Sequence, residues 1–163
     1  MNAKLKRVCI HWTAGGLKAN AIDRKHYHFI FEDDGKVIKG VYPPEANARQ
    51  LKNGDTYAAH CAGGNSRTLG VAVCGAFKGY KGGTFTQKSL EACLKFVAQF
   101  CKANDIPINE DTVYTHYEFG LKHKETDSAG KIDINSIPWE PQLKPHEVGD
   151  WIRTKVKWYM VNP

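Results

Sequence analysis

Three short apolar runs constrain the fold of this chain more than any other feature. Residues 6–10, 69–73 and 113–115 are mostly apolar and rich in β-branched side chains, which is typical of buried strands. The first run ends at His11, and the last leads directly into His116. We expect all three runs to be strands of one sheet, with residues 69–73 near its centre.

A hairpin is predicted between the first two runs. Residues 27–31 alternate between aromatic and other side chains, as a strand does. Asp33-Asp34-Gly35 is a turn sequence, and residues 37–41 fit the return strand. Residues 43–67 are rich in proline and glycine and are expected to be mostly loop.

Helical patterns fall in three places. Residues 20–25 fit a short helix, and residues 147–159 form an amphipathic pattern near the end of the chain. Between them, apolar residues recur at helical spacing from Thr86, a suitable N-cap, to Asn104, which closes the helix. Residues 117–132 are polar and irregular, so no regular element is expected there.

Mixed strands and helices predict a mixed α/β fold, with a central mixed β-sheet flanked by helices. The length of 163 residues fits a single domain over residues 1–163. No apolar run approaches the roughly 20 residues needed to span a bilayer. The basic stretch at residues 4–7 is not followed by an apolar region of about 7–15 residues. We therefore expect synthesis in the cytoplasm without a signal peptide.

Charge and cysteine content narrow the classes of function. The net charge of +6 favours anionic partners, or else it only keeps the surface soluble. No RNP-type motif, zinc finger or basic helix is present, so a nucleic-acid partner is not expected. Five cysteines without CxxC spacing argue against a disulfide framework or a Cys-rich zinc site, and they favour a reducing compartment.

Two histidines stand out by position. His11 and His116 each follow a short apolar strand, and ligands of mixed α/β sheets tend to bind at the carboxyl ends of strands. Two imidazoles and one carboxylate, with one position left to water, are the usual composition of a catalytic zinc centre. Either histidine taken alone could instead be an ordinary hydrogen-bonded residue, because no compact motif such as HExxH is present.

Several blocks of sequence occur in a specific order. They are His11-Trp12-Thr13, His26-Tyr27-His28-Phe29-Ile30, Asp34-Gly35-Lys36-Val37, Ala59-His60-Cys61, Asn65, Thr68 to Gly75, Thr115-His116-Tyr117-Glu118 and Gly130-Lys131-Ile132-Asp133-Ile134. This order resembles that of the N-acetylmuramoyl-L-alanine amidases, which include phage-lysozyme-type amidases, bacterial cell-wall amidases and peptidoglycan recognition proteins. The resemblance covers about residues 6–135.

The resemblance implies a zinc site and a catalytic lysine. In this family, Zn²⁺ is held by a histidine after the first strand, a second after a late strand, and a Cys or Asp beyond it. These positions are His11, His116 and Asp133 here, and Lys131 matches the catalytic lysine two residues before the third ligand. The segment after His116 is longer than in short family members, so Asp127 is the alternative third ligand.

Further site residues follow from the same resemblance. Some family members use a strand glutamate, but Ala72 stands at that position. The other branch uses a tyrosine, which matches Tyr27 as a catalytic residue. His60 matches a groove residue of the family, and we expect His28, His60 and Asn65 to contact substrate, with a structural role as the alternative for His28. The remaining histidines, His26, His123 and His146, are expected at the surface without an assigned role.

The implied function is hydrolysis of peptidoglycan between N-acetylmuramic acid and the L-alanine of its stem peptide. A monomeric phage or prophage endolysin, which reaches the cell wall after release from the cytoplasm, fits these features. Two alternatives remain: a cytosolic amidase that recycles soluble muropeptides, and a non-catalytic peptidoglycan-binding module. Retention of Lys131 and Asp133 argues against the second alternative.

Overall fold

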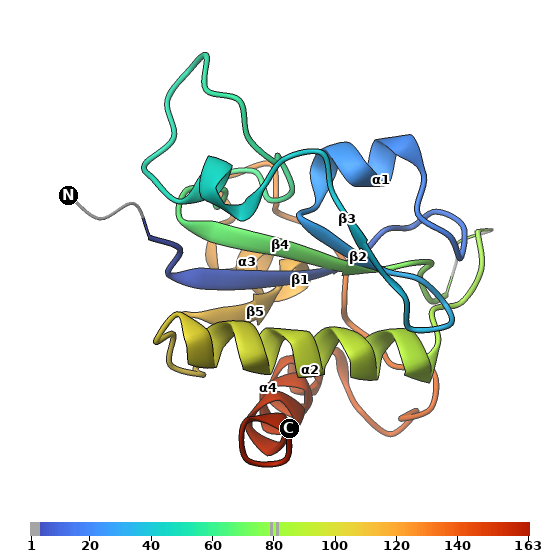
Figure 1. Cartoon of the computed structure of the whole chain (residues 1–163). Coiled ribbons are helices and arrows are strands. Elements are labelled where there is room, and N and C mark those ends of the chain that lie inside the picture. Colours follow the sequence, from blue (N-terminus) through green and yellow to red (C-terminus); the bar gives the residue numbers. More distant parts are fainter. Residues whose placement is uncertain (1–3, 79, 81) are drawn as a thin grey trace.

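A five-stranded mixed sheet organises the chain (Figure 1). The computed structural model describes residues 4–78, 80 and 82–163. The strands are β1 (Arg7–Trp12), β2 (Phe29–Phe31), β3 (Val37–Lys39), β4 (Thr68–Val73) and β5 (Val113–Thr115), in the order β3-β2-β4-β1-β5. The predicted runs are confirmed as strands, and β4 lies at the centre as expected. The fold is a single α/β domain, as the sequence predicted.

Strand direction explains why distant residues meet at one edge of the sheet. β1 is parallel to both β4 and β5, and β2 is parallel to β4. Only the predicted hairpin partner, β3, runs antiparallel, and Gly35 turns the hairpin with a φ of 88°. Because the carboxyl ends of parallel strands share an edge, His11 near the end of β1 and His116 just after β5 come together.

Among the residues that the structure describes, four α-helices and a 3₁₀ turn complete the fold. They are α1 (Ala21–His26), η1 (Pro44–Asn47), α2 (Gln87–Ala103), α3 (His116–Lys122) and α4 (Pro145–Val161). The predicted caps of α2 are confirmed: the Thr86 side chain accepts a hydrogen bond from the Ser89 N–H, and Asn104 is the C-cap. No helix within residues 4–78, 80 and 82–163 is long and apolar enough to cross a membrane.

The expectation of an irregular segment after His116 was wrong at its start, where α3 forms. The Thr115 side chain accepts from the Glu118 N–H, and the Glu118 carboxylate accepts from the Thr115 N–H. This capping box, a threonine three residues before a glutamate, is a helix signal that can be read from the sequence. The helix is short, and its buried partner on α4 is far away in the chain.

That partner is Arg153. Its guanidinium donates to both carboxylate oxygens of Glu118, at 3.0 and 2.9 Å, and to the Val113 carbonyl at 2.9 Å. Gly149 allows this approach, because a Cβ there would lie about 2 Å from the Glu118 carboxylate. The contact fixes α3 against α4 and β5, and thereby fixes the position of His116.

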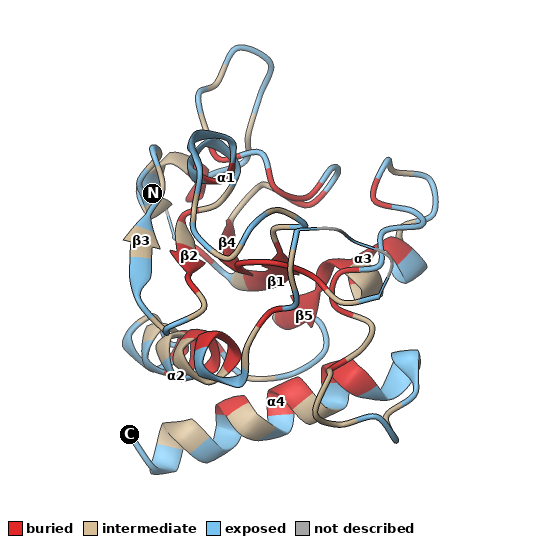
Figure 2. Ribbon diagram, turned by 90° about the vertical axis from the view of Figure 1, so that its right-hand side faces the viewer, coloured by how far each residue is buried: buried red, intermediate tan, exposed pale blue. Residues whose placement is uncertain are grey.

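The two faces of the sheet have different compositions. Val8, Ile10 and Trp12 of β1 point into the main apolar core with α2 and α4, which show buried residues on their sheet-facing sides (Figure 2). The alternate residues Arg7, Cys9 and His11 point to the opposite face, where α1, α3 and the loops lie. The functional side chains described below belong to this second face.

Candidate metal centre and groove

Three predicted ligands converge at the carboxyl edge of the sheet. The Asp133 carboxylate lies 2.9 Å from His11 Nδ1 and 3.4 Å from His116 Nδ1. All three side chains are buried, and their ligand atoms lie within 4.8 Å of one another. The group can therefore bind a metal ion, and it offers the two nitrogens and one oxygen that a zinc site commonly uses.

The orientation of His11 is fixed from behind. Its Nε2 lies 3.0 Å from His60 Nδ1, and His60 Nε2 lies 3.3 Å from the Thr68 carbonyl oxygen. Without a metal, the Asp133 carboxylate accepts from His11 Nδ1–H, since a carboxylate only accepts. If a metal ion replaced that proton, His11 Nε2 would donate to His60 Nδ1 and His60 Nε2 to the Thr68 carbonyl, which would leave the Nδ1 lone pair of His11 for the ion. Gly70 makes room for His60, because a Cβ there would lie 2.5 Å from the imidazole.

An independent chain orients His116. Its Nε2 lies 2.9 Å from the Ser128 hydroxyl, which donates to the Ala62 carbonyl at 2.7 Å. Since the hydroxyl proton is used on Ala62, Ser128 accepts from Nε2–H, so Nδ1 is the nitrogen of His116 that a metal would use. Both histidines thus present Nδ1 toward one point. This is the support that metal-binding histidines normally have, so the residues present fit a metal.

Burial and pairing set the charges of the group. Burial lowers the pKa of His11, which favours the neutral imidazole that a metal requires. Burial raises the pKa of Asp133, but its hydrogen bonds from His11 and His116 outweigh burial and hold that pKa below the usual value. Burial also lowers the pKa of His116, but contacts with Asp133 and Cys61 outweigh burial and raise that pKa to about 9. A metal ion must therefore displace a proton held at His116.

A second group of ligand atoms, from Cys9, His11 and His60, is less suited to a metal. Burial raises the pKa of the Cys9 thiol, so the thiolate that a metal needs is disfavoured there. His60 already donates to Thr68. Asp127, the alternative third ligand in the sequence, is exposed and is absent from both groups of ligand atoms found among the described residues.

An open groove of about 850 Å³ leads to the metal group. Its walls are rich in aromatic and small side chains, and they include Trp12, Tyr27, Tyr57, Tyr80, Ala62, Gly63, Asp127 and Lys131. The Tyr27 ring lies 5.1 Å from the His11 ring, between centroids. Burial raises the pKa of Tyr27, so its hydroxyl stays protonated at neutral pH. Lys131 is exposed and lines the groove from the segment at residues 130–133, two residues before Asp133.

The residues expected to contact substrate divide into two groups. His60 and Asn65 line the groove, although Asn65 Oδ1 also accepts from the N–H groups of His60 and Cys61 at 2.9 Å each. The expectation for His28 is corrected: it is 1% exposed and lies outside the groove lining. His28 Nδ1 accepts from the Gly70 N–H, and Nε2 lies 2.9 Å from Asn47 Oδ1. It therefore connects Asn47, at the end of η1, to β4.

Sequence reasoning missed Ser128 and Gly70. Ser128 is completely buried, and its hydroxyl donates to the Ala62 carbonyl, which links its own loop to the loop at Ala62. Nothing in its sequence context indicates that contact, because it depends on how two loops meet. Gly70, by contrast, could have been found, since a glycine inside a central strand commonly marks a close approach of another group.

Comparison with known proteins identifies the family. A family model described as N-acetylmuramoyl-L-alanine amidase matches residues 1–133, most of the chain. The chain belongs to this family. A search of curated proteins found no significant match. Family membership agrees with the observed site, because the match ends at Asp133, the third residue of the metal group.

Solved amidase and endolysin structures share the fold. The amidase LysC from Clostridium intestinale URNW has a TM-score of 0.56 and 14% identity, covering 95% of this chain and 87% of LysC. The Ph2119 endolysin from the Thermus scotoductus MAT2119 bacteriophage has a TM-score of 0.55 and 15% identity, covering 96% and 87%. The PlyG catalytic domain has a TM-score of 0.54 and 21% identity, covering 97% and 84%. At these identities the likeness shows the fold alone.

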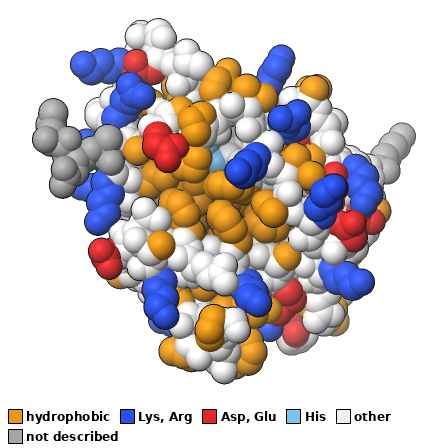
Figure 3. Space-filling model, in the orientation of Figure 1, with side chains coloured by type: hydrophobic (Ala, Val, Ile, Leu, Met, Phe, Trp, Pro, Cys, Tyr) orange, Lys and Arg blue, Asp and Glu red, His pale blue; other side chains and the backbone are white. Residues whose placement is uncertain are grey.

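The positive charge of this chain is dispersed over the face seen in Figure 3. On the face seen in Figure 3, Lys and Arg side chains are scattered among white and orange atoms and do not form one continuous stripe. The charge therefore acts as a general attraction to anionic surfaces on this face.

Proposed function

We propose that this chain is a zinc-dependent amidase that hydrolyses the bond between the lactyl group of N-acetylmuramic acid and L-alanine in peptidoglycan. The observation that carries the proposal is the convergence of His11 Nδ1, His116 Nδ1 and the Asp133 carboxylate at the floor of an open groove. Family membership supplies the substrate class. The aromatic groove walls suit a ligand made of sugar rings and peptide.

The chain's own residues divide the chemistry. Zinc, held by His11, His116 and Asp133, would supply Lewis acidity toward water and toward the scissile carbonyl. Tyr27 keeps its proton and borders the metal group, so its hydroxyl can orient the attacking water. Lys131 brings a positive charge to the groove, where it can stabilise the oxyanion that develops on the carbonyl oxygen.

We propose cell-wall lysis as the biological setting, with action on the wall after release from the cytoplasm and with the protein as a monomer. Two observations support this setting. Two of the proteins that share the fold are described as an amidase and a phage endolysin. The groove is open to solvent and not enclosed, as a polymeric substrate requires. A recycling enzyme would instead prefer soluble muropeptides.

Digestion of purified sacculi tests the proposal. Mass spectrometry should detect stem peptides that begin with a free L-alanine amine, together with intact glycan strands. Asp133→Ala should release none and should lose the metal, whereas Asp127→Ala should keep both metal and activity. Release of sugars, a metal-free but active protein, or loss of zinc only in Asp127→Ala would each contradict part of the assignment. Faster cleavage of soluble fragments than of sacculi would favour recycling.

A further inference from the structure

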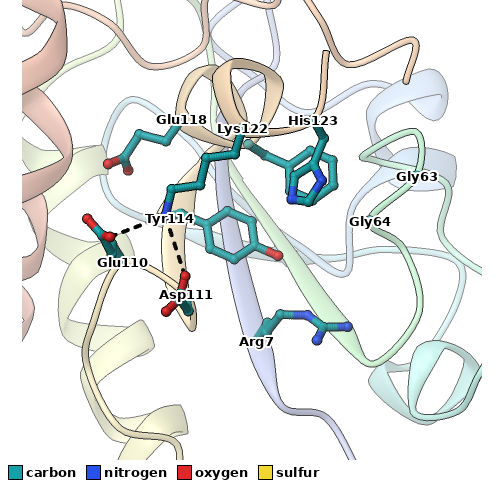
Figure 4. Close-up of a pocket in the computed structure, with 10 residues that line it drawn as sticks. Arg7, Gly63, Gly64, Glu110, Asp111, Tyr114, Glu118, Lys122 and His123 are labelled. Carbon is teal, nitrogen blue, oxygen red and sulfur yellow. Dashed lines mark hydrogen bonds and ion pairs between the residues drawn. The ribbon is translucent and has the colours of Figure 1, made fainter. Parts of the chain in front are cut away.

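A second cavity lies on the same face of the sheet as the metal group, at the other end of β1 (Figure 4). Its volume is about 310 Å³, enough for a ligand about the size of one sugar unit. Its lining comes from the start of β1, from β5, from α3 and from the glycine loop at residues 63–64. Gly63 lines both this cavity and the groove, so the two are immediate neighbours.

Arg7 supplies a fixed positive charge to this cavity. Its Nε donates to Thr68 Oγ1 at 3.2 Å, and its Nη2 donates to the Ser66 carbonyl at 2.6 Å. Both acceptors are neutral, and no carboxylate of the described residues pairs with Arg7. The guanidinium is therefore held in place with its charge uncompensated. A guanidinium in this condition is well suited to bind a carboxylate.

Aromatic rings form the adjoining wall. Tyr114 stacks on Phe119 with ring centroids 5.8 Å apart, and Phe119 stacks on His123 at 4.2 Å. The side chain of His123 is 45% exposed, so its outer face is available to a ligand. In Figure 4, the Tyr114 hydroxyl, the His123 ring and the Arg7 guanidinium border the same space. A flat ring face beside hydrogen-bonding groups suits a pyranose.

The acidic residues of the cavity gather away from Arg7. Lys122 Nζ lies 3.4 Å from carboxylate oxygens of both Glu110 and Asp111, and Figure 4 shows this group on the opposite side of Tyr114 from the glycine loop. The Glu118 carboxylate is paired with Arg153. An anionic group that enters the cavity is therefore directed toward Arg7 and away from the acidic pair.

We propose that this cavity binds an acidic sugar, a pyranose that carries a free carboxylate. The assignment rests on the proposed function. Hydrolysis of the amide adds a hydroxyl to the lactyl carbonyl carbon and a proton to the alanine nitrogen, so one product is a sugar with a free carboxylate. Before cleavage the same carbonyl is part of a neutral amide. The cavity therefore selects a cut glycan unit over an uncut one and holds it beside the groove.

Titration with three small probes tests this site on the full chain. N-acetylmuramic acid carries both the ring and the carboxylate, N-acetylglucosamine carries only the ring, and lactate carries only the carboxylate. By NMR, N-acetylmuramic acid should shift the amide signals of Gly63 and Gly64 in a saturable manner. It should bind at least about tenfold more tightly than either other probe, since a hydrogen bond to a charged group has about that worth. Equal affinity for the two sugars would overturn the proposal.

Matched variants separate the cavity from the groove. Arg7→Gln can keep the hydrogen bond to Thr68 but removes the positive charge. It should weaken the binding of N-acetylmuramic acid at least about tenfold. Lys95→Gln, at an exposed site on α2, makes the same change in net charge and should leave the affinity unchanged. His123→Ala should weaken the binding of both sugars, whereas the binding of lactate should change little. Unaltered affinity in Arg7→Gln, or shifts confined to residues 130–133, would also overturn the proposal.

These measurements need no catalysis, so the two proposals can fail separately. Binding without release of stem peptides from sacculi would contradict the proposed function and leave an acidic-sugar site. Release of stem peptides without binding of N-acetylmuramic acid would contradict only the assignment of the cavity.

Discussion

The two faces of the central sheet are built from alternate residues of the same strands, yet they depend on different physics. On one face, Val8 and Ile10 join a continuous apolar core under α2 and α4. On the other, Cys9 and His11 lie among buried polar groups whose nitrogens and oxygens are hydrogen-bonded to specific partners. Apolar burial scales with area and tolerates change in shape. Buried polar groups require defined partners, so this face is specified atom by atom.

The largest effect on this comparison should come from His116→Ala on the polar face. Zinc should be lost and amide hydrolysis should fall by about three orders of magnitude or more, because a metal ligand is removed. The apolar core is untouched, so the midpoint of thermal unfolding of the metal-free protein should stay within a few degrees of that of the metal-free parent. Elemental analysis, sacculus digestion and calorimetry measure the three quantities. An unfolded variant would show that the two faces are not separable.

Leu94→Ala is the mirror of that change on the apolar face. Leu94 is fully buried on α2, so its truncation should lower the free energy of unfolding by about 2–5 kcal/mol. The folded protein should still bind one zinc ion and cleave sacculi at the parental rate. Denaturant unfolding gives the stability, and metal content is measured on the folded fraction. Loss of zinc from folded Leu94→Ala would contradict the division between the faces.

Lys131→Ala and Tyr27→Phe should separate catalysis from metal binding within the polar face. Lys131 acts on charge that develops in the transition state, so its loss should lower kcat by about 10²–10³ with little change in KM. Tyr27→Phe keeps the ring but deletes the hydroxyl, and should lower the rate at least about tenfold. Both variants should retain zinc. Parental turnover in both would make Tyr27 an ordinary groove aromatic and Lys131 a surface charge.

The pH dependence of stability should also arise mainly on the polar face. Burial lowers the pKa of His28 from 6.5 to about 4. Between these values the unfolded chain binds the proton and the native chain does not, so stability rises with pH. The contribution of His28 is complete above pH 6.5 and is lost as the pH falls to about 4, by roughly 3 kcal/mol. Denaturant unfolding from pH 7 to 4 should show a shallower decline in His28→Gln. Parallel curves for the two proteins would refute this origin.

The smallest effect should come from His60→Gln, one shell of contacts away from the metal. With a metal ion at His11, His60 would accept from His11 Nε2 and so leave Nδ1 to the ion. Its replacement should weaken zinc affinity by about 10–100-fold, as loss of a supporting hydrogen bond usually does. Competition with a chelator measures the affinity without reference to activity. His26→Gln, at an exposed histidine, is the matched control and should bind zinc as the parent does.

Much of the fold could be predicted because its signals are local. Apolar runs located β1, β4 and β5, and the cap at Thr86 located α2 to the residue. Helix α3 was missed although its capping box is local, since a helix of seven residues carries little periodicity. Its stability depends on Arg153, which lies 35 residues beyond Glu118.

The strands, the long helices, the family and the metal residues His11 and His116 could be predicted from the sequence, with Asp133 preferred over Asp127 as the third. Three further features appear only in the folded chain: the histidine nitrogens that face the metal group, the role of His28 in holding Asn47, and the cavity that Arg7 forms with Tyr114 and His123. The reason is physical. Periodicity and caps are set within a few residues, whereas a tautomer or an uncompensated charge depends on partners that only folding brings within hydrogen-bonding distance.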